Sequence, residues 1–295
     1  MGLVLNTNIA AMNATRNLQN TQADQATTFQ RLSTGLRVNS AKDDAAGLYL
    51  AQSQTKDIRG LNMATRNASD GISMAQTAEG ALDQISSNLQ RINELAIQSA
   101  NGTYNTAARG GLQKEVTQLS EEIARIISVT EFNGKPLLSS AAQTVTFQIG
   151  FRNESASRIN LDTENGLVGI LGNANNASAA ASLARIIDAG LVQSANGMNI
   201  TSISAARAAI TETRALIDGI SETRATFGAI MNRFEAVISG NNIYEENLSA
   251  ARSRIQDADF AEETSNLSKQ QVLQQAGIAS LSQANQSSQV ILGLL

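Results

Sequence analysis

The sequence of 295 residues contains no cysteine, no histidine and no tryptophan, and only one proline. Without cysteine there is no disulfide framework and no thiolate chemistry. Without histidine the Ser-His-Asp and Cys-His arrangements of nucleophilic enzymes are excluded, and the commonest metal ligand is missing. We therefore expect no cofactor and no metal, and we predict that the chain is not an enzyme.

Aromatic residues make up only 3% of the chain, although hydrophobic residues make up 42%. A core of this composition must consist of Leu, Ile, Val and Ala, which suits helices packed closely at small side chains. The single proline, Pro136, leaves little to interrupt regular backbone. The expected fold class is mainly α, a long antiparallel helical bundle or coiled coil.

Strong charge of either sign is also missing, because the net charge is −4 and no run of Lys or Arg occurs. A nucleic-acid partner favours a clustered basic face and is not expected. No apolar stretch is long enough to span a bilayer, so no membrane insertion is expected. The first basic residue is Arg16, which disfavours a secretory signal. Two locations are compatible with these features: the cytosol, or the outside of the cell after export by a route without a cleaved signal.

A long apolar stripe is present between residues 61 and 99. Its positions alternate in steps of three and four, and all but the last are apolar or glycine: Leu61, Ala64, Ala68, Gly71, Ala75, Ala78, Leu82, Ile85, Leu89, Ile92, Ala96 and Ser99. This heptad spacing predicts one helix about 58 Å long. Other apolar residues, including Met74 and Leu95, lie off the stripe, so the helix is expected inside a bundle.

Two further stripes share this spacing. After a break bracketed by Asn101-Gly102 and Gly110-Gly111, the second stripe contains Leu112, Val116, Leu119, Ile123, Ile126 and Thr130. The third contains Ile203, Ala206, Ile210, Thr213, Ile217, Ile220, Arg224, Phe227, Met231, Phe234 and Ile238. Because the connection between the first two stripes is short, we expect their helices to be antiparallel.

Between the second and third stripes the period changes to two. Val145, Phe147 and Ile149 alternate with polar residues, and residues 158–162 alternate as well. This pattern predicts a small β-hairpin or a pair of hairpins. The composition farther on predicts an exposed loop over Gly172–Ala181 and a short helix over Ser182–Leu191.

The two ends of the chain are more polar than the middle. From Thr264 to Leu295 the only charged side chain is Lys269, and half of the stripe positions there carry an amide or a hydroxyl. Such a seam is too polar to hold an isolated coiled coil. Two interpretations remain, a disordered tail or a segment that orders only when it packs among copies of itself.

The neighbouring carboxylates Asp43 and Asp44 could suggest acid–base chemistry. Adjacent residues on a helix do not face each other, however. Ser40 to Asp43 instead match a helix capping box, with Asp44 favourable in the first turn. We therefore expect a helix start and not a catalytic pair.

Residues near both ends resemble the paired signatures of bacterial flagellins. The resemblance is carried by Leu3–Asn17, Leu32–Gly47, Asn247–Ile255, Asp257–Phe260, Val272–Gly277 and the Leu-Leu ending, and it covers roughly residues 1–170 and 203–295. It implies a hairpin-shaped chain whose N- and C-termini pair. By resemblance, residues 1–44 and 252–295 form an inner coiled-coil domain, 45–171 and 202–251 form a helical bundle with the β-hairpin, and 172–201 form a short variable exposed segment.

A flagellin-like chain polymerises into the open helical filament of the bacterial flagellum, a secreted homo-oligomer that serves swimming. The resemblance also implies export without a cleaved signal, a chaperone on about Asp259–Leu295, and flagellar cap and hook-junction partners. The alternatives are a hook–filament junction protein, which the intact C-terminal signature disfavours, a secreted enzyme, for which the lack of histidine leaves almost no room, and a secreted receptor-binding effector.

The resemblance further implies three sets of site residues. Innate immune recognition by Toll-like receptor 5 is expected at Gln90, Arg91, Glu94, Leu95 and Glu115. The epitope of a plant immune receptor is expected to include Gln30, Arg31, Asp43, Asp44 and Gly47. The filament core interface is expected at Leu5, Ile9, Met12, Phe29, Leu32, Leu267, Ile278, Leu281 and Leu292.

Overall fold

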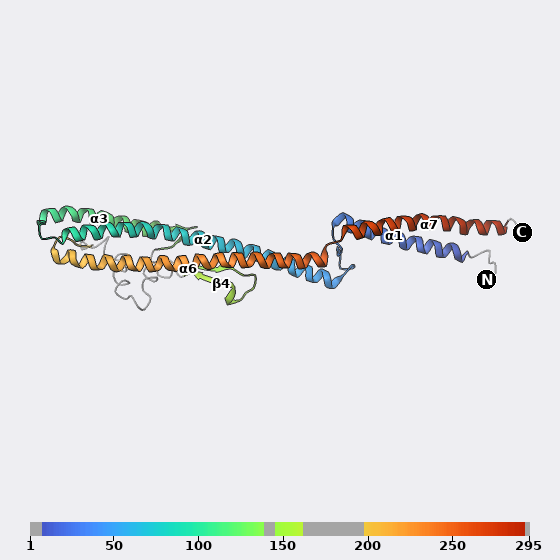
Figure 1. The fold of residues 1–295 in the computed structure, drawn as a ribbon, viewed down its shortest axis with the longest axis horizontal. Coiled ribbons are helices and arrows are strands. Elements are labelled where there is room, and N and C mark those ends of the chain that lie inside the picture. Colours follow the sequence, from blue (N-terminus) through green and yellow to red (C-terminus); the bar gives the residue numbers. More distant parts are fainter. Residues whose placement is uncertain (1–7, 139–144, 162–197, 293–295) are drawn as a thin grey trace. The chain divides into compact units, whose positions relative to one another are not determined.

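The computed structural model describes residues 8–138, 145–161 and 198–292, and its described part is mainly helical, as predicted (Figure 1). The helices are α1 (Ile9–Thr34), α2 (Ala45–Ser99), α3 (Thr106–Val129), α6 (Ile203–Gln256) and α7 (Phe260–Leu292). The loop expected over Gly172–Ala181 and the helix expected over Ser182–Leu191 lie outside the described residues. Within the described part, no helix is both long and apolar enough to cross a bilayer.

The chain divides into two compact units. The terminal unit contains the described residues of Met1–Arg59 and Glu245–Leu295, and the central unit contains those of Gly60–Tyr244. The long helices α2 and α6 each contribute one end to the terminal unit and the rest to the central unit. From the sequence we expected the domain boundaries after residues 44 and 251, and those domain boundaries stay a prediction.

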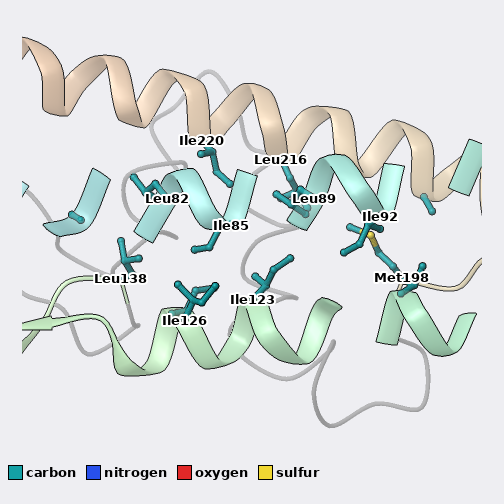
Figure 2. Close-up of a cluster of buried hydrophobic side chains, with 14 of the residues drawn as sticks. Leu82, Ile85, Leu89, Ile92, Ile123, Ile126, Leu138, Met198, Leu216 and Ile220 are labelled. Atoms are coloured by element: carbon teal, nitrogen blue, oxygen red, sulfur yellow. The ribbon is translucent and has the colours of Figure 1, made fainter. Parts of the chain in front are cut away.

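Helices α2, α3 and α6 build the core of the central unit. All twelve positions of the first predicted stripe are buried, which confirms the stripe. Figure 2 shows side chains of α2 lying between those of α3 and α6. The central layer contains Leu82, Ile85, Leu89 and Ile92 of α2, Ile123 and Ile126 of α3, and Leu216 and Ile220 of α6. Off-stripe Met74 and Leu95 are buried too, as a bundle requires.

Helix α6 packs through a seam that differs from the predicted stripe at alternate positions. The buried residues there are Ala209, Leu216 and Thr223, whereas the predicted Ile210, Ile217 and Arg224 are only partly buried. Arg224 lies at the edge, where its guanidinium contacts Asp83 at 2.9 Å and Glu79 at 3.6 Å on α2. The apolar pattern of a two-sided helix does not reveal which of two adjacent residues faces inward.

Four short strands form two antiparallel hairpins, which confirms the predicted β region. Strands β1 (Glu131–Phe132) and β2 (Lys135–Pro136) are joined by Asn133 and Gly134, at φ 51° and 74°. Positive φ at both central residues is what a two-residue hairpin turn of this kind requires. Strand β3 (Val145–Gln148) pairs with β4 (Arg158–Leu161), with Phe147 opposite Ile159.

Candidate functional site: the terminal hairpin

Two short linkers join the helices of the terminal unit. Gly35 ends α1 with φ 71°, a left-handed conformation that favours glycine. The Gly35 carbonyl then accepts a hydrogen bond from the Ala258 N–H at 2.9 Å, and the Arg37 N–H donates to the Gln256 carbonyl at 2.7 Å. The linker that precedes α2 is therefore bonded to the last residue of α6, and the end of α1 is bonded to the linker that precedes α7.

Helix α7 begins immediately after that junction. Asp259 caps it, because its Oδ1 accepts a hydrogen bond from the Ala261 N–H at 2.8 Å. Glu262 and Glu263 occupy the first turn, where negative charge is favourable to the helix dipole. The C-terminal motif that resembled a family signature is thus a helix start.

Helices α1 and α7 lie side by side and antiparallel (Figure 1). The Asn8 amide of the α1 cap donates to the Ala284 carbonyl at 3.0 Å. Near the other end of the pair, the Gln270 amide donates to the Thr28 hydroxyl at 3.1 Å. We name this helix pair the terminal hairpin.

The most buried contacts of the terminal hairpin are polar. Thr28 is 4% exposed and Glu263 is 6% exposed. Glu263 forms an ion pair with Arg31 at 3.0 Å. The less exposed positions of both helices recur in steps of about three and four. They are Asn8, Ala11, Ala14, Leu18, Thr21, Gln25, Thr28, Arg31, Leu32, Glu263, Asn266, Leu267, Gln270, Gln274, Gly277, Leu281 and Ala284. Only the four leucines among them are large and apolar.

The large apolar side chains of the terminal hairpin point largely to solvent. Seven of them are at least 49% exposed, namely Ile9, Met12, Phe29, Phe260, Val272, Leu273 and Ile278. A soluble two-helix coiled coil has the opposite arrangement, with its apolar residues between the helices. The most buried contacts of the terminal hairpin are therefore polar, while most of its large apolar side chains are exposed.

This arrangement separates the predicted interface residues into two groups. Ile9, Met12, Phe29 and Ile278 are outward, whereas Leu32, Leu267 and Leu281 are partly buried. Leu5 and the Leu292 side chain lie outside the described residues. The sequence reasoning missed Phe260, Val272 and Leu273, although the consecutive aliphatic pair 272–273 beside a polar stripe was an available signal.

The predicted capping box at Ser40 is wrong, because α2 begins only at Ala45. Asp44 is the cap, and its Oδ1 accepts a hydrogen bond from the Gly47 N–H at 2.8 Å. Asp43 instead closes the preceding turn, and its Oδ2 accepts from the Ser40 N–H and hydroxyl, each at 2.9 Å. The backbone and hydroxyl hydrogen bonds from Ser40 lower the pKa of the Asp43 carboxyl below its usual 3.8.

The residues of the expected plant epitope belong to ordered elements of the terminal unit. Gln30 is exposed near the end of α1, and Arg31 is held by its ion pair with Glu263. Gly47 is buried in the first turn of α2, where an added Cβ would lie 2.3 Å from an Asp44 carboxylate oxygen.

The expected receptor residues of the central unit form a charged cluster on α2 and α3. Arg91 contacts Glu115 at 2.8 Å and Glu94 at 3.0 Å. Hydrogen bonds to the two carboxylates raise the pKa of the Arg91 guanidinium, so it is charged at any physiological pH. Gln90 is exposed beside them, and Leu95 is only 1% exposed and belongs to the core, as its place off the stripe predicted.

A polar clamp near the junction of α2 and α3 was not predicted. The Ser99 hydroxyl donates to the Ile200 carbonyl at 2.5 Å. The Gln113 side chain accepts from the Ile200 N–H at 2.7 Å and donates to the Met198 carbonyl at 3.0 Å. Hydrogen bonds between a side chain and a distant backbone segment leave no periodic signal in a sequence.

No group of acidic side chains suited to a metal ion occurs in the described ranges.

A mainly helical fold whose paired terminal helices expose large apolar side chains is typical of a structural protein that associates with other chains. Comparisons with known proteins identify the family. The model of the bacterial flagellin N-terminal helical region matches residues 5–143, and that of the C-terminal helical region matches residues 208–295. The chain belongs to the bacterial flagellin family.

Two relatives agree with this assignment, and one solved structure shares the fold. A flagellin of Halalkalibacterium halodurans is 40% identical over 99% of this chain and 100% of its own length. A flagellin of Xenorhabdus nematophila is 40% identical over 100% of both chains. A flagellar hook-associated protein of Vibrio parahaemolyticus shares the fold, with a TM-score of 0.56 and 13% identity, over 73% of this chain and 100% of its own.

The protein is accordingly a structural subunit of the bacterial flagellar filament. It is close in length to the two flagellins above, because each alignment covers nearly all of both chains. It self-assembles, and its place of action is the filament outside the cell.

Proposed function

We propose that the terminal hairpin is the element through which copies of this chain assemble. The supporting observation is that seven large apolar side chains of the pair are exposed, while an ion pair and amide hydrogen bonds lie between the helices. Each exposed side chain would contribute about 1 kcal/mol when its exposed half is buried, and the set on the order of 7 kcal/mol before the cost of association. A lone subunit gains none of this stabilisation.

The polymer expected from such a surface is open. When a surface on one copy packs against a different surface on the next and the rotation between them does not close, a helical filament results. The two helices of the terminal hairpin carry different apolar sets, so they provide unlike surfaces. The charge-poor α7 helix also allows copies to pack closely with little repulsion.

Ile278→Asp tests this proposal on the outer face of α7. Ile278 is 54% exposed in the subunit, so the substitution should change the stability of the monomer by less than about 0.5 kcal/mol. In the filament the aspartate would be buried without a partner, at a cost of several kcal/mol for each subunit. We expect no filaments by electron microscopy and an unchanged circular dichroism spectrum.

Ser128→Asp is the matched control, because Ser128 is an exposed residue of α3 outside the terminal hairpin. It adds the same charge to the chain and should still assemble. Deletion of about 30 residues from either end should also abolish filaments. Normal filaments from Ile278→Asp, or from either truncation, would contradict the proposed role of the terminal hairpin.

We also propose that the chain has a purely structural role with no catalysis. The lack of histidine and cysteine in the sequence supports this proposal, because nucleophilic and metal-assisted mechanisms rely heavily on those residues.

An export chaperone is proposed to bind about Asp259–Leu295 and to shield exposed apolar side chains there. It would cover Val272, Leu273 and Ile278 before copies meet. Flagellar cap and hook-junction proteins are proposed to contact the same element at the filament ends.

A second proposal concerns innate immune recognition of the free subunit. Gln90, Arg91, Glu94 and Glu115 are proposed to contact Toll-like receptor 5, with Leu95 supporting them from the core. Arg91→Ala should weaken binding to the receptor ectodomain by about 2 kcal/mol, as for a central arginine of an interface. Arg125→Ala is the control, since Arg125 is also exposed and paired with a glutamate on α3. Equal losses from both variants would refute the assignment.

The plant epitope is proposed to require partial unfolding of the subunit. Arg31, Asp43 and Asp44 are engaged in an ion pair, a turn and a helix cap in the folded chain. A peptide of residues 30–51 should therefore bind the plant receptor more tightly than the folded subunit does. Tighter binding of the folded subunit would contradict this proposal.

A further inference from the structure

The linker between α2 and α3 contains an exposed Asn101-Gly102 pair whose surroundings are chemically unusual. The Asn101 backbone carbonyl accepts a hydrogen bond from the Arg109 guanidinium at 3.0 Å. The Asn101 side-chain carbonyl accepts one from the Thr103 N–H at 3.2 Å. Both oxygens of one asparagine are therefore contacted by donors, and one of those donors is charged.

We propose that Asn101 is a site of self-catalysed deamidation, at which the folded chain promotes its own covalent modification. In this reaction the Gly102 backbone nitrogen attacks the Asn101 side-chain carbon and forms a five-membered imide. The nitrogen loses its proton to solvent, and the side-chain nitrogen leaves as ammonia. Water then opens the ring at either carbonyl and yields aspartate or isoaspartate, so one water is consumed and nothing is oxidised or reduced.

The two hydrogen bonds lie where charge develops during the reaction. The nucleophile is the deprotonated amide between Asn101 and Gly102, and its negative charge is shared with the carbonyl oxygen that Arg109 contacts. Attack places negative charge on the Asn101 side-chain oxygen, which the Thr103 N–H contacts. Donors fixed at such positions stabilise the transition state more than the ground state.

The space around Gly102 is also open. Gly102 is exposed, and a Cβ added to it would meet no atom within 4 Å. The guanidinium of Arg109 is held in place because it also donates to the Ser99 carbonyl at 2.9 Å, and its side chain is mostly buried. The charged donor is thus positioned in advance of the reaction, while solvent has access to the attacking nitrogen.

The chain contains an internal comparison at Asn133-Gly134. This pair has the same two residue types, and both are exposed. Asn133 is held at φ 51° in the turn between β1 and β2, and no described residue donates a hydrogen bond to its side chain. The deamidation rate of Asn133 therefore serves as the rate of an Asn-Gly pair that lacks two donors like Arg109 and the Thr103 N–H.

Modification at Asn101 has a structural consequence. An aspartate would add negative charge at the C-terminal end of α2, where the helix dipole disfavours it. An isoaspartate would route the backbone to Gly102 through the former side-chain carbon, which adds a methylene after the Asn101 Cα, and the carbonyl that Arg109 contacts would become a free carboxylate. Either product places a new carboxylate near the Arg109 guanidinium and should therefore alter the junction of α2 and α3.

The test is peptide mapping by mass spectrometry of the full-length protein, incubated in dilute solution at mildly alkaline pH. Incubation in isotope-labelled water marks the oxygen that enters on ring opening. We expect Asn101 to deamidate about tenfold faster than Asn133 in the folded protein, and the two rates to converge in guanidinium chloride. A folded-state rate at Asn101 equal to or below that at Asn133, or below its own unfolded-state rate, would overturn the proposal.

Two variants identify the cause. Arg109→Met keeps a long stem but removes the charged donor, and it should bring the Asn101 rate down to that of the unfolded chain while Asn133 is unchanged. Arg109→Lys retains a cation and should lose less. If circular dichroism shows that Arg109→Met is unfolded, Arg109→Lys decides the question. An Asn101 deamidation rate in folded Arg109→Lys equal to that in the folded parent protein would contradict a role for the fork-shaped guanidinium.

Discussion

The packing of the central unit can be tested by replacing Gly71 and Gly80 of α2 with alanine, one at a time, and comparing the stabilities of the two variants. Both glycines are inside the same helix. An added Cβ at Gly80 would meet nothing within 4 Å. At Gly71 it would lie 2.7 Å from Cζ of Phe234 and within 3.1 Å of two further atoms of that ring. Alanine should therefore have opposite effects at the two positions.

The magnitudes follow from two competing terms. Alanine is favoured over glycine in a helix interior by about 1 kcal/mol, and this gain applies at both positions. At Gly71 the Phe234 ring has to move, but it is fully buried and makes an edge-on contact with Phe147 at 5.5 Å between ring centroids. Overpacking of this kind costs about 1–3 kcal/mol. The two variants should thus differ by about 2 kcal/mol.

Chemical denaturation followed by circular dichroism measures this difference. Gly80→Ala should raise the free energy of unfolding by about 1 kcal/mol, whereas Gly71→Ala should lower it by about 1 kcal/mol at an unchanged m-value. Adding Phe234→Leu to Gly71→Ala should recover part of the loss, because a smaller side chain relieves the contact. Equal stabilisation by both single variants would refute the close packing of Gly71 against Phe234.

Two smaller effects should accompany these results. The pKa of Asp43 is lowered in the folded chain, so its carboxylate stabilises the turn above the unfolded value near 3.8 and loses this effect as the pH falls through the lower folded pKa. The stabilities of Asp43→Asn and the parent protein should therefore converge on acidification, and a constant difference would contradict the assignment. Arg224→Met should cost less than about 1 kcal/mol, because its pairs with Glu79 and Asp83 are partly exposed and screened, and added salt should shrink the difference further. A cost that persists in high salt would indicate a packing role instead.

The features that the sequence predicted best are local and periodic. The stripe from Leu61 to Ser99 needed only regular spacing, and every one of its positions is buried. The alternation at Val145–Ile149 and the Asn133-Gly134 turn are likewise short-range patterns, and both correspond to hairpins. Such patterns are visible in a sequence because a helix or a strand repeats its exposure with a fixed period.

Predictions were less accurate where the answer depended on which neighbour a residue meets. Ile210 and Ile217 were expected in the stripe of α6, but the neighbouring Ala209 and Leu216 are the residues that are buried. The start of α2 was expected at Ser40, because the capping pattern of Ser40 to Asp43 was present, whereas Asp44 is the residue that caps the helix. In each case the local pattern was compatible with two structures, and packing selected one.

By itself, the sequence determined that the protein is helical, that it lacks the residues of common catalytic centres, and that its ends are poor in charge and rich in amides. Only the tertiary structure decided how those ends pair. Thr28 and Arg31 meet Gln270 and Glu263 across more than two hundred residues of chain, and that register directs the large apolar side chains outward. The physical reason is that helical periodicity is a local property, whereas the partner of each helix face is chosen by burial and hydrogen bonding across the whole fold.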